Sequence, residues 1–238
     1  MRSRRGFTLA ELVFFIVVLV GLFALLVAVV LHQRAVAEEA ARRAGCIGSL
    51  RNVGLALVQY ADDHDGRYPP LVDATGNVVP AVDNAGVVSS LPARTGFVVL
   101  LHEGYLTTTK VFICPSSGER VNRMWDYETD YQKVKPAELA AGFKAENCSY
   151  GWDPTKTHAA DAGCAIVADK PPGNVLSANE GRTGNNSPNH KGEGQNVFYN
   201  DGHVKWATTP TPDSGDDPDI YTGARGYEKS TTDAKIIR

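Results

Sequence analysis

An apolar run near the beginning of the chain limits more strongly than any other feature what this sequence can fold into. Residues 7–31 form a stretch of 25 residues in which Thr8 and Glu11 are the clearly polar members. At about 1.5 Å per residue, a helix of this length extends for roughly 37 Å, which exceeds the ~30 Å thickness of a hydrocarbon core. The sequence therefore predicts a helix that crosses a membrane once.

The residues that flank the run indicate how such a helix would lie in the membrane. A basic head of three arginines ends at Gly6, and arginines beside a membrane segment favour the cytoplasmic side. An ordinary signal anchor would explain these features. A cleaved secretory signal would not, because its apolar part is about 7–15 residues long. Neither explains Glu11, since an unpaired charge inside a membrane helix costs about 2.5–3.5 kcal/mol or more.

Residues 5–13, RGFTLAELV, closely resemble the cleavage and methylation signal of type IV prepilins and the related pseudopilins. The resemblance implies that a prepilin peptidase cuts between Gly6 and Phe7 on the cytoplasmic side and methylates the new amino terminus. It also implies that Glu11 is neutralised by the Phe7 amino group of a neighbouring subunit, so that the burial cost of Glu11 favours assembly. The expected partners are identical or related pilin-like subunits, the prepilin peptidase and an inner-membrane assembly platform.

The helix is predicted to continue beyond the membrane segment and to become amphipathic there. The first proline of the chain is Pro69, and Gly66 supplies a left-handed stop shortly before it. A continuous helix from residue 7 to about residue 62 would be roughly 84 Å long. Apolar residues at spacings of three and four form one stripe on its second half: Ile47, Leu50, Gly54, Leu57 and Ala61.

These features divide the chain into four segments. They are a prepilin leader (residues 1–6), a transmembrane or filament-core helix (7–31), an amphipathic continuation (32–65) and a globular head (66–238). The residues outside the apolar block suffice for one domain with its own core. We therefore expect an α+β fold, pilin-like, in which the long N-terminal helix packs on a small antiparallel-sheet head.

Shorter patterns predict the elements of the head. Residues 96–105 suit a short helix or a buried strand, residues 136–144 suit a short helix, and residues 71–95 suit a variable loop, with or without short strands. Strands are expected at 111–115, 148–152 and 165–168. The clearest signal is a hairpin, in which residues 195–199 and 203–206 flank a tight turn at residues 200–202.

The hairpin belongs to a stretch that resembles a carboxy-terminal motif of many prepilin-like proteins from planctomycetes and related bacteria. That motif places a histidine nine residues before Asp-Gly, whereas ten residues separate His190 from Asp201 and Gly202 here. His190, Asp201 and His203, together with Asp169, could form a metal or catalytic site. The alternative is structural, because Asp201 is an expected turn residue and His203 begins the following strand.

All four cysteines follow the apolar run, and they are therefore expected in the periplasm, where disulfides persist. Four cysteines allow three pairings. We expect Cys148 to pair with Cys164 in a short loop, and Cys46 to pair with Cys114, joining the helix to the head. One disulfide and two free buried thiols is the alternative. A structural zinc site is not expected, because the chain has no Cys-x-x-Cys spacing.

An acidic segment near the C-terminus offers oxygen ligands for calcium. Asp213, Asp216, Asp217 and Asp219 lie within seven residues of each other. Major pseudopilins of type II secretion bind calcium in their carboxy-terminal loop, so the resemblance supports a calcium site here. An ordinary solvated acidic loop is the alternative. No other cofactor is expected.

Charge and motifs favour a non-enzymatic function. The net charge is −3, and loss of the leader arginines leaves 21 basic against 27 acidic residues, which argues against nucleic-acid binding. No hydrolase, zinc-protease or phosphate-loop motif is present. The leading hypothesis is a filament subunit of a type IV pilus or a type II secretion pseudopilus. The alternative is a membrane-anchored periplasmic enzyme or ligand-binding domain that uses His190, Asp201 and His203.

Overall fold

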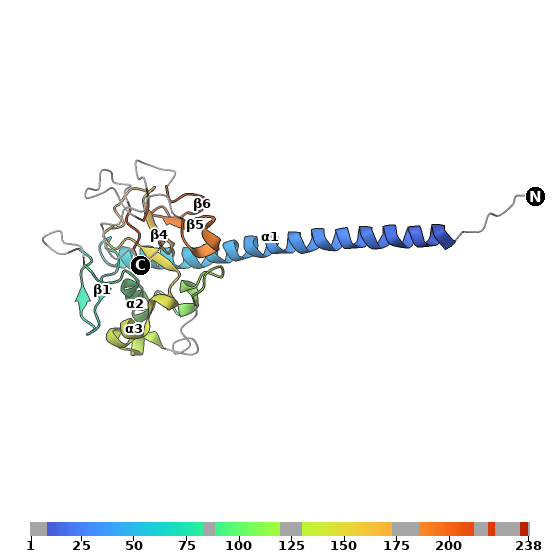
Figure 1. The fold of residues 1–238 in the computed structure, drawn as a ribbon. Coiled ribbons are helices and arrows are strands. Elements are labelled where there is room, and N and C mark those ends of the chain that lie inside the picture. Colours follow the sequence, from blue (N-terminus) through green and yellow to red (C-terminus); the bar gives the residue numbers. More distant parts are fainter. Residues whose placement is uncertain are drawn as a thin grey trace, which may run out of the picture. The chain divides into compact units, whose positions relative to one another are not determined.

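The structure, a computed structural model, describes residues 9–82, 89–119, 130–172, 186–211, 219–221 and 234–237. The chain forms two compact units, Met1–Ala41 and Arg42–Arg238. Helix α1 (Leu9–Asp63) contributes residues to both units (Figure 1). The prediction of one long N-terminal helix is thereby confirmed.

The first unit presents an apolar helix surface. The large apolar side chains between Leu9 and Leu31 are exposed, and none of the most apolar stretch of α1 is buried. Within the described residues, α1 is the helix that is long and apolar enough to cross a membrane. In the protein, this surface requires a cover of lipid or of other apolar helices.

The second half of α1 is amphipathic, as the stripe predicts. Leu50, Gly54, Leu57 and Ala61 are buried and Ile47 is half-buried, whereas the polar side chains on the opposite face are exposed. The helix ends where Gly66 takes φ 75° and its N–H bonds the Ala61 carbonyl at 2.8 Å. The expected left-handed stop is therefore present.

A four-stranded antiparallel sheet forms the head. Its strands lie in the order β3 (Tyr150–Trp152), β4 (Ala165–Asp169), β5 (Gln195–Tyr199) and β6 (Val204–Ala207). A second sheet pairs β1 (Leu71–Val72) with β2 (Val78–Val79). The predicted hairpin is correct: β5 and β6 flank a turn in which Gly202 has φ 89°. The fold is α+β, with antiparallel sheets.

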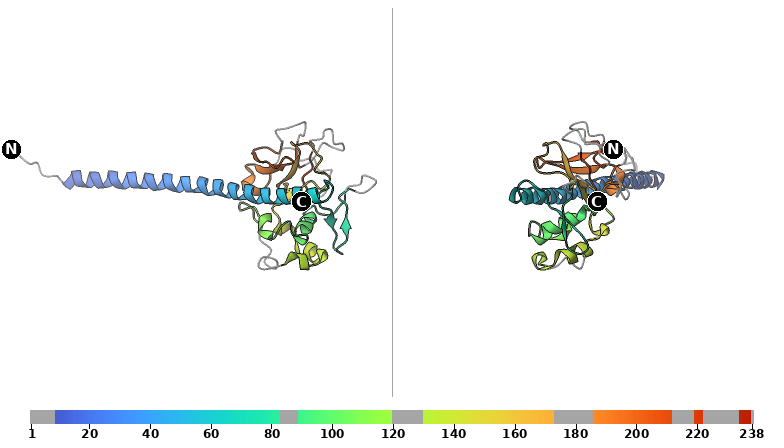
Figure 2. Two further views of the ribbon diagram at one scale, coloured as in Figure 1. Left: turned by 180° about the vertical axis from the view of Figure 1, so that it is seen from behind. Right: turned by 90° about the vertical axis from the view of Figure 1, so that its left-hand side faces the viewer.

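Helices complete the head on the other side of α1 from the four-stranded sheet (Figure 2). The ambiguous segment at 96–105 is helical in α2 (Arg94–His102), and α3 (Pro136–Gly142) confirms the second predicted helix. The described residues also contain short 3-10 segments: η1 (Thr109–Phe112), η3 (Tyr131–Lys133) and η4 (Ala145–Asn147) lie before the four-stranded sheet in the chain, and η5 (Asn189–Gly192) lies just before β5.

The strand predicted at residues 111–115 is wrong. Thr108 caps a 3-10 turn there, because its hydroxyl accepts a hydrogen bond from the Lys110 N–H at 3.3 Å. The Phe112 side chain is fully buried and stacks on Phe97 with 5.1 Å between the ring centroids. The apolar residues of this segment therefore fill the core from a turn, which a short apolar run cannot reveal.

Helix α1 approaches the sheet closely at Gly54. A Cβ atom at this position would overlap the ring of Phe198, a fully buried residue of β5. Close packing leaves such a ring little room to move. Gly54 is therefore required by contact with the sheet.

We expect Gly54→Ala to reduce the free energy of unfolding by about 1–3 kcal/mol, because the added methyl group overpacks the interface. Gly48→Ala is the matched control, since Gly48 lies on the same helix with no atom within 4 Å of the added Cβ. Alanine at that site is expected to be neutral or stabilising by up to about 1 kcal/mol. Thermal unfolding of the detergent-solubilised chain measures both. Equal stability of the two variants would contradict the packing argument.

Candidate functional site

Four polar or ionisable side chains meet in the interior of the head. Cys46, Cys114, Asp169 and His190 each direct one potential ligand atom into a common space, and these atoms all lie within 4.8 Å of one another. All four residues are buried. We refer to them as the Cys–Asp–His cluster.

Each member comes from a different element of the fold. Cys46 lies on the buried face of α1, and Cys114 follows η1. Asp169 is the last residue of β4, and His190 lies in η5, just before β5. The packing of α1 on the sheet thus brings together residues that are distant in the sequence.

The distances within the cluster are short. The Cys46 thiol donates a hydrogen bond to Asp169 Oδ1 at 3.2 Å. Cys114 Sγ lies 3.3 Å from His190 Nε2, and that nitrogen lies 3.6 Å from Asp169 Oδ2. The Tyr150 hydroxyl is 3.3 Å from Cys46 Sγ and closes one side of the cluster.

Two asparagines hold the Asp169 carboxylate in place. The Asn196 backbone N–H donates to Oδ2 at 2.7 Å and its side-chain amide donates to the same atom at 3.2 Å. The Asn189 amide donates to Oδ1 at 2.8 Å. Complete burial raises the pKa of Asp169, and the hydrogen bonds from Asn196 and Asn189 oppose that shift. The carboxylate is therefore fixed in orientation.

His190 adopts an uncommon backbone conformation. Its φ of 51° and ψ of 32° are left-handed, and Lys191 follows with φ 60°. A non-glycine residue in this region is uncommon, and two in succession mark a locally strained segment. In this conformation the His190 ring lies in the cluster, where it meets the Trp206 ring edge-on with 5.2 Å between centroids.

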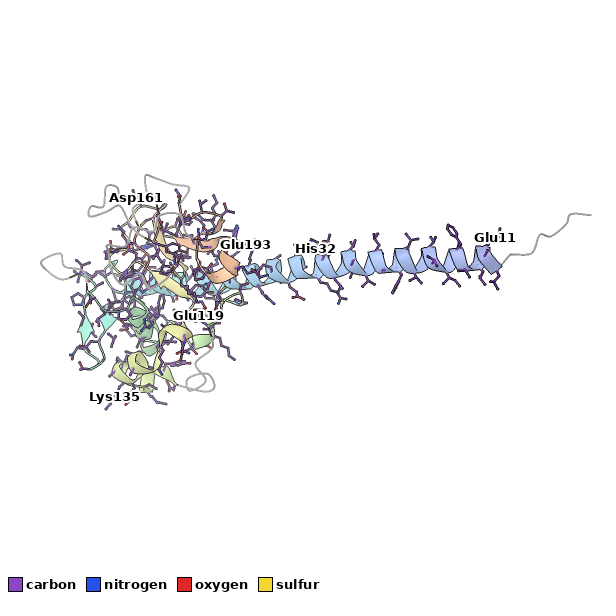
Figure 3. The ribbon with its side chains drawn as sticks, in the orientation of Figure 1. Glu11, His32, Glu119, Lys135, Asp161 and Glu193 are labelled. Atoms are coloured by element: carbon purple, nitrogen blue, oxygen red, sulfur yellow. The ribbon has the colours of Figure 1, made fainter. Side chains whose placement is uncertain are left out.

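Arg43 closes the cluster on the outside. Its guanidinium lies 4.3 Å from the centroid of the Trp206 ring, a cation–π contact, and it forms an ion pair with Glu193. Figure 3 labels Glu193, the residue that directly follows η5. The segment that carries His190 is therefore fastened to α1 one turn before Cys46.

The two thiols of the cluster differ in their ionisation. Hydrogen bonding with Cys46 lowers the pKa of Cys114 to about 7, and His190 contributes in the same direction. Burial raises the pKa of Cys46 above its usual range. Cys114 is therefore the thiol that more readily forms a thiolate, which is the form that attacks electrophiles and binds metals.

The structure separates the residues of the predicted histidine motif. His190 belongs to the buried cluster, together with Asp169 as anticipated. Asp201 and His203 lie on the exposed turn after β5, where Asp201 accepts a hydrogen bond from the His203 N–H at 3.1 Å. The His203 ring stacks on Tyr199 with 4.4 Å between centroids. The Asp201–His203 pair therefore supports the hairpin, and neither residue is a member of the cluster.

Neither predicted disulfide is formed in this structure, in which all four cysteines are buried. Cys46 and Cys114 are neighbours, as the predicted pairing requires, but their thiols are not bonded and each contacts a further polar group of the cluster. The Cys148 thiol donates to the Tyr150 carbonyl at 3.2 Å, and the Cys164 thiol lies 3.8 Å from the Ala165 carbonyl. These two thiols are satisfied separately by backbone oxygens.

Other predicted sites lie wholly or partly outside the described residues. Asp213, Asp216 and Asp217 are among them, so the calcium site stays a prediction. Their neighbour Asp219 is described: it is fully buried, and its carboxylate accepts a hydrogen bond from the Tyr221 N–H at 2.8 Å. Gly6 and Phe7 are also outside the described part, whereas Glu11 lies in the first turn of α1 (Figure 3).

Sequence reasoning missed the complete cluster. It placed Asp169 with His190 and Cys46 with Cys114, but it treated the two pairs as unrelated. A local Cys-x-x-Cys spacing was the signal sought for zinc, and a cluster with one residue from each of four elements has no such spacing. The signal that could have revealed the cluster was the presence of four cysteines in the same domain as a histidine motif.

Comparison of the chain with protein-family models, with curated proteins and with solved structures finds no match in any of the three. Conclusions about function therefore rest on the residues and the geometry of this protein.

The arrangement of the thiols predicts the result of a thiol titration. After unfolding in the presence of a chelator and without reductant, all four cysteines are expected to react with an alkylating reagent, because each is a free thiol. Mass spectrometry counts the modified residues, and a sample reduced beforehand serves as the control. If only two cysteines are modified before reduction, one disulfide is present, and if none is modified, two are present. Either result would contradict this prediction.

Proposed function

We propose that the protein is a non-enzymatic subunit of a type IV pilus-like or type II secretion pseudopilus filament. The observation that carries this proposal is the surface of the first half of α1. It is apolar on all sides between Leu9 and Leu31, and it contains a single carboxylate, Glu11, in its first turn. A membrane anchor would need only the apolar surface. A helix that packs against other subunits in a filament also accounts for the carboxylate of Glu11.

The energetics of Glu11 favour assembly over residence in the bilayer. Burial of an unpaired carboxylate in hydrocarbon costs about 2.5–3.5 kcal/mol or more. A neighbouring subunit cleaved after Gly6 would present the methylated amino group of Phe7 as a counter-ion. The apolar side chains then exchange lipid contacts for contacts with identical helices, and the charge that opposed membrane burial becomes paired.

The head suits a structural role in such a filament. The second half of α1 lies within the core of the head, where Leu50, Val53 and Leu57 are fully buried. A mechanical force along the helix would therefore act directly on the core of the head. The separation of His190 from the Asp201–His203 turn also supports this role over a membrane-anchored enzyme that would use those three residues together.

In this proposal, the arginines of the leader keep the N-terminus in the cytoplasm, so that the globular head lies in the periplasm before assembly. Residues 7–68 contain no proline. Many pilins have a kink in this helix that a proline introduces, and this chain has no proline there to produce one. This difference favours the secretion pseudopilus over the pilus.

Replacement of Glu11 tests the proposal. We expect Glu11→Ala to be cleaved after Gly6 at the normal rate but to enter filaments poorly, because the counter-ion of the Phe7 amino group is lost. Glu38→Ala is the matched control, since Glu38 is an exposed carboxylate of the same helix beyond the apolar run. Mass spectrometry of the mature N-terminus reports processing, and sheared or pelleted filaments report assembly.

Filament formation by Glu11→Ala at the level of the unmodified protein would contradict the proposal, and so would an N-terminus that retains residues 1–6. Loss of assembly in Glu38→Ala as well would show that the assay responds to any change of charge on α1.

A further inference from the structure

We propose that the Cys–Asp–His cluster is a structural site for a tetrahedrally coordinated transition-metal ion, best satisfied by zinc, with Cys46, Cys114, Asp169 and His190 as the four ligands. The proposal is independent of filament assembly, because it concerns only residues inside the head.

The distances fit a single ion. Bonds to zinc of about 2.3 Å from sulfur and about 2.0–2.2 Å from nitrogen and oxygen place tetrahedral ligands about 3.4–3.8 Å apart. The structure has 3.2 Å between Cys46 Sγ and Asp169 Oδ1, 3.3 Å between Cys114 Sγ and His190 Nε2, and 3.6 Å between His190 Nε2 and the other oxygen of the same carboxylate, Oδ2. The remaining separations do not exceed 4.8 Å. Small side-chain movements therefore suffice to bind the ion.

The donor set selects the class of metal. Two sulfur donors exclude calcium and magnesium, which take oxygen ligands, and they favour zinc or another thiophilic ion. Four protein donors complete a tetrahedron, and the cluster is buried, so no position faces solvent for a reacting water. Closed four-ligand sites of this kind are structural, whereas catalytic sites keep one open position.

The buried carboxylate of Asp169 also favours a bound metal ion. Asp169 is fully buried, and within the described part of the chain the side chain at ion-pair distance from it is His190, 3.6 Å away. Buried carboxylates normally have a full ionic partner or coordinate a metal. A divalent cation at the centre of the cluster would supply charge compensation directly to the carboxylate.

The surroundings are organised as an outer shell. The amides of Asn189 and Asn196 orient Asp169, and the Trp206 ring contacts His190 at its edge. Metal-binding histidines and carboxylates are commonly held by such partners. The left-handed backbone of His190 and Lys191 is a further cost that a purely apolar core would not require, and a metal bond to His190 accounts for it.

The site would fasten α1 to the rest of the head. Its ligands come from α1, from the segment after η1, from β4 and from η5. A metal ion therefore joins four segments, whereas the predicted Cys46–Cys114 disulfide would join two. Because such binding occurs only in the folded head, the binding free energy adds to its stability.

Metal analysis of the full chain in detergent tests the proposal. After chelation and reconstitution with zinc alone, we expect one bound zinc per chain and a higher melting temperature than in the chelated sample. Cobalt in place of zinc should produce the visible bands of a tetrahedral site and thiolate-to-cobalt charge-transfer absorption in the near ultraviolet. Zinc should also slow the alkylation of Cys46 and Cys114 relative to their alkylation in the chelated protein, with the modified residues identified by peptide mapping.

Variants assign the ligands. Cys114→Ser should lower the charge-transfer intensity by about half, because one of two thiolates is lost, and it should weaken zinc binding. Cys148→Ser is the matched control: Cys148 is equally buried but lies outside the cluster, and its replacement should leave the cobalt spectrum unchanged. Asn189→Ala should weaken zinc binding about 10–100-fold, because it removes an outer-shell partner of Asp169.

Three results would overturn the proposal: absence of stoichiometric zinc from the reconstituted protein, a cobalt spectrum that is unaffected in Cys114→Ser, or a Cys46–Cys114 disulfide in the non-reduced peptide map. If Cys114→Ser fails to fold, the cobalt spectrum and the alkylation pattern of the unmodified chain still test whether the cluster binds a metal. A filament defect in Glu11→Ala has no bearing on any of these outcomes.

Discussion

The packing of the second half of α1 against the four-stranded sheet is the interaction on which the rest of the head depends. Gly54 permits this packing, because any side chain there would overlap Phe198 of β5. On the same buried face, Leu50, Val53 and Leu57 supply the apolar area. The sheet, in turn, covers a helix face that would otherwise expose these side chains to water, and the burial of their apolar surface provides the main driving force for the contact.

The Cys–Asp–His cluster lies at one end of this apolar contact and is its polar counterpart. Cys46 is on the α1 face that carries Leu50, one turn away, and it meets Asp169 and His190 from the sheet side. A group of buried ionisable residues is costly unless every member has a partner. The asparagines orient Asp169, and the Trp206 ring packs against His190. A bound metal would join the four ligand atoms at one centre, and it would make the joint between helix and head resistant to separation.

Pattern reasoning succeeded where one local property determines the outcome. The length and composition of residues 7–31 predict the apolar helix, the stripe from Leu50 to Ala61 predicts its buried face, and the turn chemistry at Gly202 predicts the hairpin. It failed at residues 111–115, where an apolar run forms a capped 3-10 turn whose Phe112 fills the core. It also failed to join the two halves of the cluster, because spacing along the chain carries no information on which buried side chains meet.

The sequence by itself determined the helix, its change from apolar to amphipathic, its end near Gly66 and the character of Glu11 as an isolated carboxylate. These are properties of consecutive residues, and helix geometry converts them directly into positions on a surface. Only the tertiary structure decided the partners of the cysteines and of His190. Those partners are set by the way α1, η1, β4 and η5 pack together, and contact across such distances in the chain is fixed by the shape of the whole core.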